Sequence, residues 1–167
     1  MRADEARSVL AALYGEILLL REEVGDLARI VAGTEVRYGT SRQEGVPFDE
    51  HFVRAYGLSE PVFYGALASK IGLIEPDLVI SITEFHRNYQ EAKKWLPLLV
   101  DTPDRRYGYF VSAVLRPACD AVNNVEPALK KIEAILSVNR PAKEIDLGYT
   151  PDVMEREHDI CNTPLPD

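Results

Sequence analysis

The feature that most constrains the fold is a heptad repeat near the N-terminus. Seven apolar residues recur there with alternating steps of three and four, which keeps one stripe of a helix turned toward a partner surface. We therefore expect a long helix over about residues 4–36, then a loop over 38–48 and a short helix over 49–56. The seven positions, which we call the heptad seam, are Leu10, Leu13, Ile17, Leu20, Val24, Leu27 and Val31.

The heptad seam has two interpretations. Mostly β-branched residues at its first positions and leucines at its fourth favour a two-stranded coiled coil, so the helix is a candidate for self-association. However, Leu18 and Leu19 lie off the seam and widen the apolar face, which suits burial inside a bundle. Gly15 and Gly25 each weaken the helix by about 1 kcal/mol relative to alanine, so packing must offset their effect.

A helical hairpin is expected in the middle of the chain. Ser59 is a good N-cap, and Pro61 suits a first helical turn, so a helix should run from there to about residue 71. Gly72 should end this helix at a positive φ. A second apolar stripe, with steps of three and four, predicts the next helix over residues 75–96.

The last part of the chain predicts a bent helix and a tail. A capping threonine and a first-turn proline at 102–104 begin a helix whose apolar face continues to about residue 138. Because this face continues across Pro117 and Pro127, we expect one kinked helix. Residues 139–167 carry four prolines and little periodicity, so this acidic tail should be either disordered or laid along the bundle.

Together these segments predict an all-α protein, a mostly antiparallel bundle of about four main helices. A length of 167 residues suits one domain with a sizeable core. We assign residues 1–138 to the helical bundle domain and residues 139–167 to the acidic tail.

Charge and cysteine content exclude several functions. The net charge is −8, and nucleic-acid affinity comes largely from neutralising phosphates, so we expect no nucleic-acid partner. Two cysteines are too few for a disulfide scaffold and fit a reducing compartment. The chain shows no signal peptide and no apolar run of bilayer length. We expect a cytoplasmic protein that meets membranes only through a missing or partner segment.

The stretch from residue 60 to residue 96 resembles a widespread group of uncharacterised bacterial helical proteins. The hairpin pattern of that group is P-x-V-[FY]…[LI]-G-[LI]-[LI]-x-P-[DE]-[LV]; residues 71–78 match its second half, whereas residues 61–63 read Pro-Val-Phe, without a residue between the proline and the valine. Many members look membrane-anchored through an upstream helix, and this chain departs from that pattern. The resemblance implies a helical hairpin and carries no established activity. The matching residues are Pro61, Val62, Phe63, Ala66, Ile71, Gly72, Leu73, Ile74, Pro76, Asp77, Leu78, Phe85 and Tyr89.

Metal-binding and catalytic patterns are weak. His86 follows Glu84 by two residues, and side chains two apart on a helix point away from each other, so they cannot share a metal. His158 and Cys161 lie three apart in the tail, where a zinc site needs two more strong donors. The core helices contain no Glu-x-x-His pair of the kind that di-iron bundles use. We therefore expect no metal site, no cofactor and no catalytic residue.

These patterns favour a non-enzymatic interaction or scaffold module, whose partner is another protein or a second copy bound through the heptad seam. The alternative belongs to a different class: a ligand-binding or enzymatic bundle with a pocket near His86. The residues expected to line that pocket are Tyr14, Phe85, His86 and Tyr89.

Overall fold

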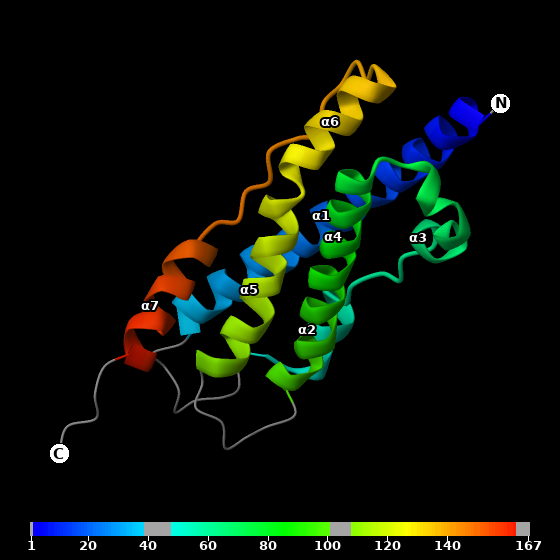
Figure 1. Cartoon of the computed structure of the whole chain (residues 1–167). Coiled ribbons are helices and arrows are strands. Elements are labelled where there is room, and N and C mark those ends of the chain that lie inside the picture. Colours follow the sequence, from blue (N-terminus) through cyan, green and yellow to red (C-terminus); the bar gives the residue numbers. More distant parts are fainter. Residues whose placement is uncertain (1, 39–47, 101–107, 163–167) are drawn as a thin grey trace.

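Helices make up all the regular secondary structure in the part of the chain described by a computed structural model, residues 2–38, 48–100 and 108–162. The predicted all-α fold is confirmed (Figure 1). The α-helices are α1 (Arg2–Tyr38), α2 (Glu50–Ala55), α3 (Phe63–Ala66), α4 (Pro76–Trp95), α5 (Gly108–Asn124), α6 (Glu126–Leu136) and α7 (Thr150–Asn162). Two 3-10 segments accompany them, η1 (Ala68–Leu73) and η2 (Leu96–Leu99).

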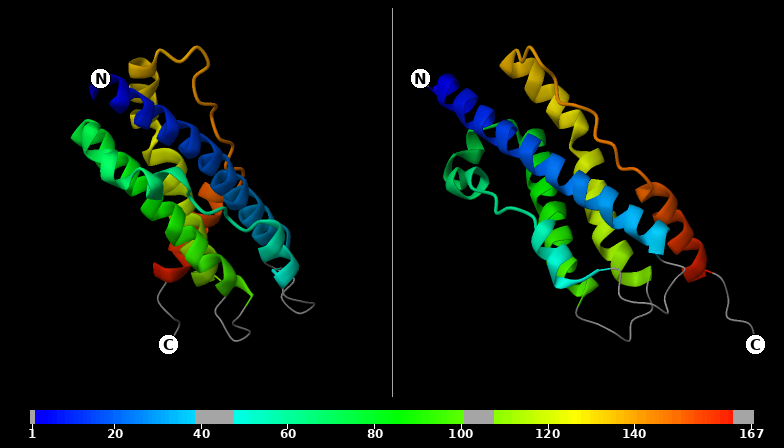
Figure 2. Two further views of the ribbon diagram at one scale, coloured as in Figure 1. Left: turned by 90° about the vertical axis from the view of Figure 1, so that its right-hand side faces the viewer. Right: turned by 180° about the vertical axis from the view of Figure 1, so that it is seen from behind.

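The long helices pack in two layers. α4 lies antiparallel to α5 and α6, and α1 crosses one face of this layer (Figures 1 and 2). α1 and α4 run in the same general direction, and α5 with α6 returns antiparallel to both. None of the described helices combines the length and the apolar character needed to cross a lipid bilayer.

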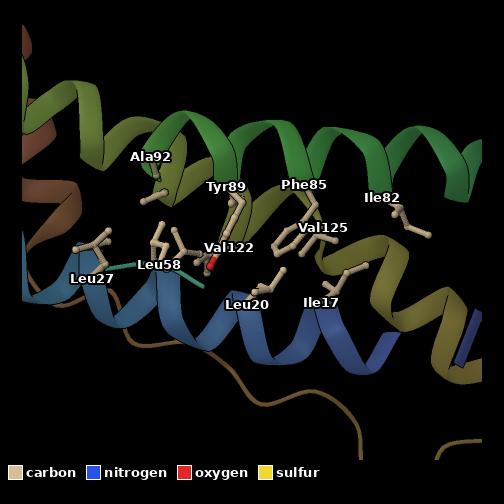
Figure 3. Packing of buried hydrophobic residues seen from close by; sticks show 14 of the residues in the cluster. Ile17, Leu20, Leu27, Leu58, Ile82, Phe85, Tyr89, Ala92, Val122 and Val125 are labelled. Atoms are coloured by element: carbon tan, nitrogen blue, oxygen red, sulfur yellow. The ribbon is translucent and has the colours of Figure 1, made fainter. Parts of the chain in front are cut away.

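The heptad seam lies on the inner side of α1. All seven side chains are at most 4% exposed, and they belong to the same hydrophobic core as α4, α5 and α6. Ile17 and Leu20 point toward Phe85 and Tyr89 of α4, and Leu27 lies on the side of Ala92 (Figure 3). The seam therefore closes within one chain, and its side chains are not on the surface where a second copy could reach them.

α5 and α6 form the predicted kinked helix, and the bend is at Val125. Pro127 lies in the first turn of α6, where its missing N–H costs least. Arg21 of α1, which is 4% exposed, donates from Nε to the carbonyl of Val122 at this bend, at 2.9 Å. Burial lowers the pKa of the Arg21 guanidinium. Pro117, by contrast, lies inside α5 without ending it.

The chain after α6 lies along the bundle over its described part, which is one of the two alternatives predicted for the tail (Figure 2). It turns at Ser137, whose φ of 56° is left-handed. Arg21 Nη1 holds the returning segment through the carbonyl of Lys143 at 2.9 Å. α7 then packs against α1 and α5 and buries Val153. Residues 163–167 lie outside the described residues.

The prediction of one helix over residues 59–71 was only partly correct. The chain forms only α3 there, followed by the 3-10 segment η1. Ser59 does not cap a helix, because its hydroxyl donates to Glu23 of α1 at 2.6 Å. Gly72 has no positive φ; among the described glycines only Gly148 has one. The link to α4 is therefore a 3-10 segment and not a glycine-capped helix end.

Candidate functional site

A cluster of polar side chains lies where residues 58–66 pass between α1 and α4. Glu16 and Glu23 are two turns apart on one face of α1, so both carboxylates reach this segment. Glu23 meets Ser59, and Glu16 meets Val62 and Phe63. The segment therefore runs antiparallel to α1, tied to it at both ends.

Glu16 takes the place of a helix cap for α3. Its Oε2 accepts from the backbone N–H groups of Val62 at 2.6 Å and Phe63 at 2.5 Å, and its Oε1 accepts from that of Tyr64 at 2.9 Å. Residue 62 supplies no side-chain cap of its own. Charged acceptors form the stronger class of hydrogen bond, so these three bonds offset the cost of burying a carboxylate that is 7% exposed.

Glu23 forms the second tie, together with Tyr89. Its Oε1 accepts from the Ser59 hydroxyl at 2.6 Å, and its Oε2 accepts from the Ser59 N–H at 3.2 Å and the Tyr89 hydroxyl at 2.9 Å. The Tyr89 hydroxyl is also 2.8 Å from the Ser59 carbonyl oxygen. Burial and the nearby Glu23 carboxylate raise the pKa of Tyr89. Tyr89 therefore remains a neutral donor that links α1, α4 and the crossing segment.

His86 is the buried histidine of this cluster. Its imidazole stacks on the ring of Tyr64 with centroids 3.9 Å apart, and its Nε2 lies 3.9 Å from Glu16 Oε1. Neither ring nitrogen has a hydrogen-bond partner, and the residue is 3% exposed. Burial lowers the pKa of His86 to about 4, although the Glu16 carboxylate opposes this shift. The imidazole is therefore neutral at physiological pH.

A hollow of about 370 Å³ opens on the α4 side of the crossing segment, with His86 in its wall. The Tyr64 hydroxyl donates to Thr83 Oγ1 at 3.3 Å beside it. The other lining residues are Glu60, Pro61, Gly65, Arg87 and Gln90.

A larger groove, of about 420 Å³, opens on the α1 side of the same segment; we call it the α1 groove. Three of its large apolar side chains are exposed: Leu19 by 67%, Val62 by 67% and Phe63 by 49%. Acidic residues form most of the rest of its lining. The full lining is Glu16, Leu19, Leu20, Glu22, Glu23, Asp26, Ser59, Glu60, Val62 and Phe63.

The four residues predicted to line a ligand pocket are all buried, and they do not meet around one hollow. Inside the core, the Phe85 ring lies edge-on to the ring of His86 and tilted to the ring of Tyr89. Tyr14 faces α6, where its hydroxyl donates to Glu133 Oε1 at 2.8 Å, and burial raises its pKa to about 12. Only His86 of the four lines the hollow beside α4. The prediction that these four residues line one pocket is therefore wrong, and the hollow beside α4 is lined by His86 with other residues.

Sequence reasoning missed the roles of Glu16 and Glu23. A signal was present, because both acids lie beside the heptad seam on a face that the chain would have to cover. The partner, however, is backbone of a segment about 40 residues away along the chain, and no residue pattern marks a backbone acceptor or donor at such a separation.

Metal and thiol chemistry have little support in the described residues. No cluster of three or more histidine, cysteine, aspartate or glutamate side chains suited to a metal ion occurs among them. The side chain of Cys161 lies outside the described residues, so the predicted absence of zinc there stays a prediction. Cys119 is half-buried, and burial raises the pKa of its thiol, which keeps it protonated.

Comparison with protein families, curated proteins and solved structures found no match for this chain. The resemblance of residues 60–96 to the bacterial helical group therefore stays a prediction from its motif.

Proposed function

We propose that this protein is a non-enzymatic interaction module that binds another protein in the α1 groove. The observation that carries the proposal is the convergence of Leu19, Val62 and Phe63, all largely exposed, on one groove. Single exposed apolar residues are ordinary, but apolar side chains gathered in a groove with a polar rim are typical of interaction sites. Phe63 is the type of aromatic anchor that carries much of the binding energy in such sites.

The rigidity of the groove also supports this proposal. Glu16 and Glu23 fix the crossing segment against α1 through hydrogen bonds to Ser59, Val62 and Phe63. A binding surface that is already ordered loses less conformational entropy when the partner docks. The carboxylates of this cluster therefore have a structural use, which favours binding over catalysis.

α1 divides these tasks between its two sides. Leu20 is 4% exposed and belongs to the core, whereas its neighbour Leu19 is 67% exposed and lines the groove. We therefore assign partner binding to the Leu19 side of the helix and not to the heptad seam. A cytoplasmic location is part of this proposal and rests on the low cysteine content.

Site-specific photo-crosslinking from the groove tests the proposed function. A photoreactive phenylalanine analogue at Val62 should give one crosslinked adduct of defined mass in cells, which mass spectrometry identifies. The same analogue at Ile80, which is 65% exposed on α4 outside the groove, is the matched control. The partner identified in this adduct, purified on its own, should then bind the wild-type chain and not the Leu19→Ser variant. Equal crosslinking from both positions would reject the groove as the binding site.

A second candidate function is small-ligand binding in the hollow beside α4, favoured by the buried, neutral and unpaired His86 in its wall. Native mass spectrometry of the purified protein tests it. A co-purifying small molecule should be lost in the Gly65→Phe variant, because the added ring occupies the hollow and residue 65 has room for a side chain. If the wild-type protein and the variant both show only the mass of the polypeptide, ligand binding in this hollow is eliminated.

A further inference from the structure

The α1 groove has two chemically different ends. The crossing segment runs antiparallel to α1, so Val62 and Phe63 lie at the level of Glu16 while Ser59 lies at the level of Glu23. Leu19 of α1 adds to the Val62 and Phe63 end. This end is apolar because the Glu16 carboxylate, although it lines the groove, is buried and fully bonded to the backbone.

The opposite end is acidic. Its lining carboxylates are Glu22, Glu23, Asp26 and Glu60. Asp26 pairs with Arg29 at 2.8 Å, and Glu60 pairs with Lys93. The bonds of Glu23 go to Ser59 and Tyr89, which carry no positive charge.

Two carboxylates at this end thus have no ion pair within the described residues, although Arg29 and Lys143 line a neighbouring hollow with Glu22. Glu22 is exposed and forms no ion pair there, and Glu23 is half-buried with neutral partners. The chain as a whole adds to the effect with a net charge of −8. A positively charged partner would be steered to this surface and would neutralise it, whereas an acidic one would be repelled.

We propose that the occupant of the α1 groove is an amphipathic helix of a partner protein, apolar at one end of its docking face and basic at the other. This inference rests on the proposed function and names the chemistry of the partner. Leu19 and Asp26 are seven residues apart, about 10 Å along α1. A matching helix carries apolar side chains one turn apart and lysine or arginine about two turns further on.

A helix fits better than an extended peptide or a second copy. A peptide that binds by strand addition needs a sheet edge, and the described residues contain no strand. A second copy docked groove to groove would place each acidic end against either the acidic end or the apolar end of the other copy, and neither arrangement is complementary in charge.

A designed peptide tests this inference on the full chain. The probe is a fluorescein-labelled helix of about 15 residues with leucines at i and i+3 and arginines at i+7 and i+10 on the same face. One control replaces the arginines with glutamates, and another moves them to the opposite face. Fluorescence anisotropy should show binding of the arginine peptide and at least about tenfold weaker binding of both controls. Binding of the arginine peptide should also weaken as the NaCl concentration is raised from about 50 to about 500 mM.

Variants of the chain locate the binding. Leu19→Ser should weaken binding of the arginine peptide about tenfold, because a buried leucine side chain contributes on that scale. Glu22→Lys should weaken it about fivefold and strengthen binding of the glutamate peptide. The matched controls, Ile80→Ser and Glu155→Lys, alter exposed residues outside the groove and should leave both affinities unchanged. Thermal melts confirm that each variant is folded.

The outcomes separate this inference from the proposed function. Equal binding of the arginine and glutamate peptides, lost in Leu19→Ser, would keep the groove as a binding site but overturn the basic partner. Failure of every peptide, with a crosslinked partner still captured from Val62, would also overturn it while the proposed function stands. Concentration-dependent sedimentation that Leu19→Ser abolishes would instead identify a second copy as the occupant.

Discussion

At the scale of single residues, Glu16 and His86 show how a buried polar pair organises its surroundings. The Glu16 carboxylate accepts three backbone N–H groups and so positions the start of α3. His86 lies 3.9 Å from it and stacks on Tyr64, without a hydrogen bond of its own. Glu16 therefore needs its negative charge to hold these hydrogen bonds, whereas His86 is stable in this place only while its ring is uncharged.

Glu16→Gln should lower the free energy of unfolding by about 3 kcal/mol, since an amide cannot accept three N–H groups and buried charge-assisted bonds are lost. Urea denaturation followed by circular dichroism measures this loss. Glu22→Gln, on the exposed side of the same helix, is the control and should change stability by less than about 0.5 kcal/mol. Equal stabilities of the two variants would show that Glu16 does not hold the crossing segment.

His86 should make the fold sensitive to acid above pH 4. Its folded pKa of about 4 lies below the ordinary value of 6.5, so as the pH falls the unfolded chain takes up the proton first. Stability from this group is complete above pH 6.5 and is lost as the pH falls toward 4, by about 3 kcal/mol. The wild type should therefore lose about 3 kcal/mol of unfolding free energy relative to His86→Leu over this range. Parallel pH profiles would contradict the buried, neutral state of His86.

At the scale of elements, α1 carries glycines with different surroundings. Gly15 has open space where a Cβ would lie, whereas a Cβ at Gly25 would collide with Ile145 of the returning segment. The sequence predicted that both weaken the helix, and it could not tell which of them packing requires. That difference depends on a segment about 120 residues away along the chain, so helical propensity alone cannot reveal it.

Alanine at the two positions should have opposite effects. Gly15→Ala should raise the free energy of unfolding by about 1 kcal/mol through helix propensity, and Gly25→Ala should lower it because Ile145 must move. A double-mutant cycle of Gly25→Ala with Ile145→Ala should show a favourable coupling of about 1 kcal/mol, measured by chemical denaturation. If the effects of the two substitutions on the free energy of unfolding are additive, Ile145 does not contact residue 25.

At the scale of the whole molecule, apolar periodicity predicted the long helices well and the crossing segment poorly. α1, α4 and the described part of the bent α5–α6 helix agree with the expected spans, because their apolar stripes are long and regular; the start expected at residues 102–104 lies outside the described residues. Residues 59–71 carried good capping and turn residues, yet Ser59 bonds to Glu23 and not to a helix start. The candidate site depends on such long-range polar contacts, so sequence reasoning named His86 and Leu20 but did not bring Leu19, Val62 and Phe63 together in one groove.

Partner binding on the Leu19 side of α1 requires that the heptad seam closes inside one chain. Leu20→Asp and Leu19→Asp test this together, by light scattering and thermal melting. We expect a monomeric wild type, a Leu19→Asp variant of unchanged melting temperature, and a Leu20→Asp variant that is strongly destabilised, because a charge is placed at a 4% exposed core position. A wild-type dimer that Leu20→Asp converts into a stable monomer would contradict the account.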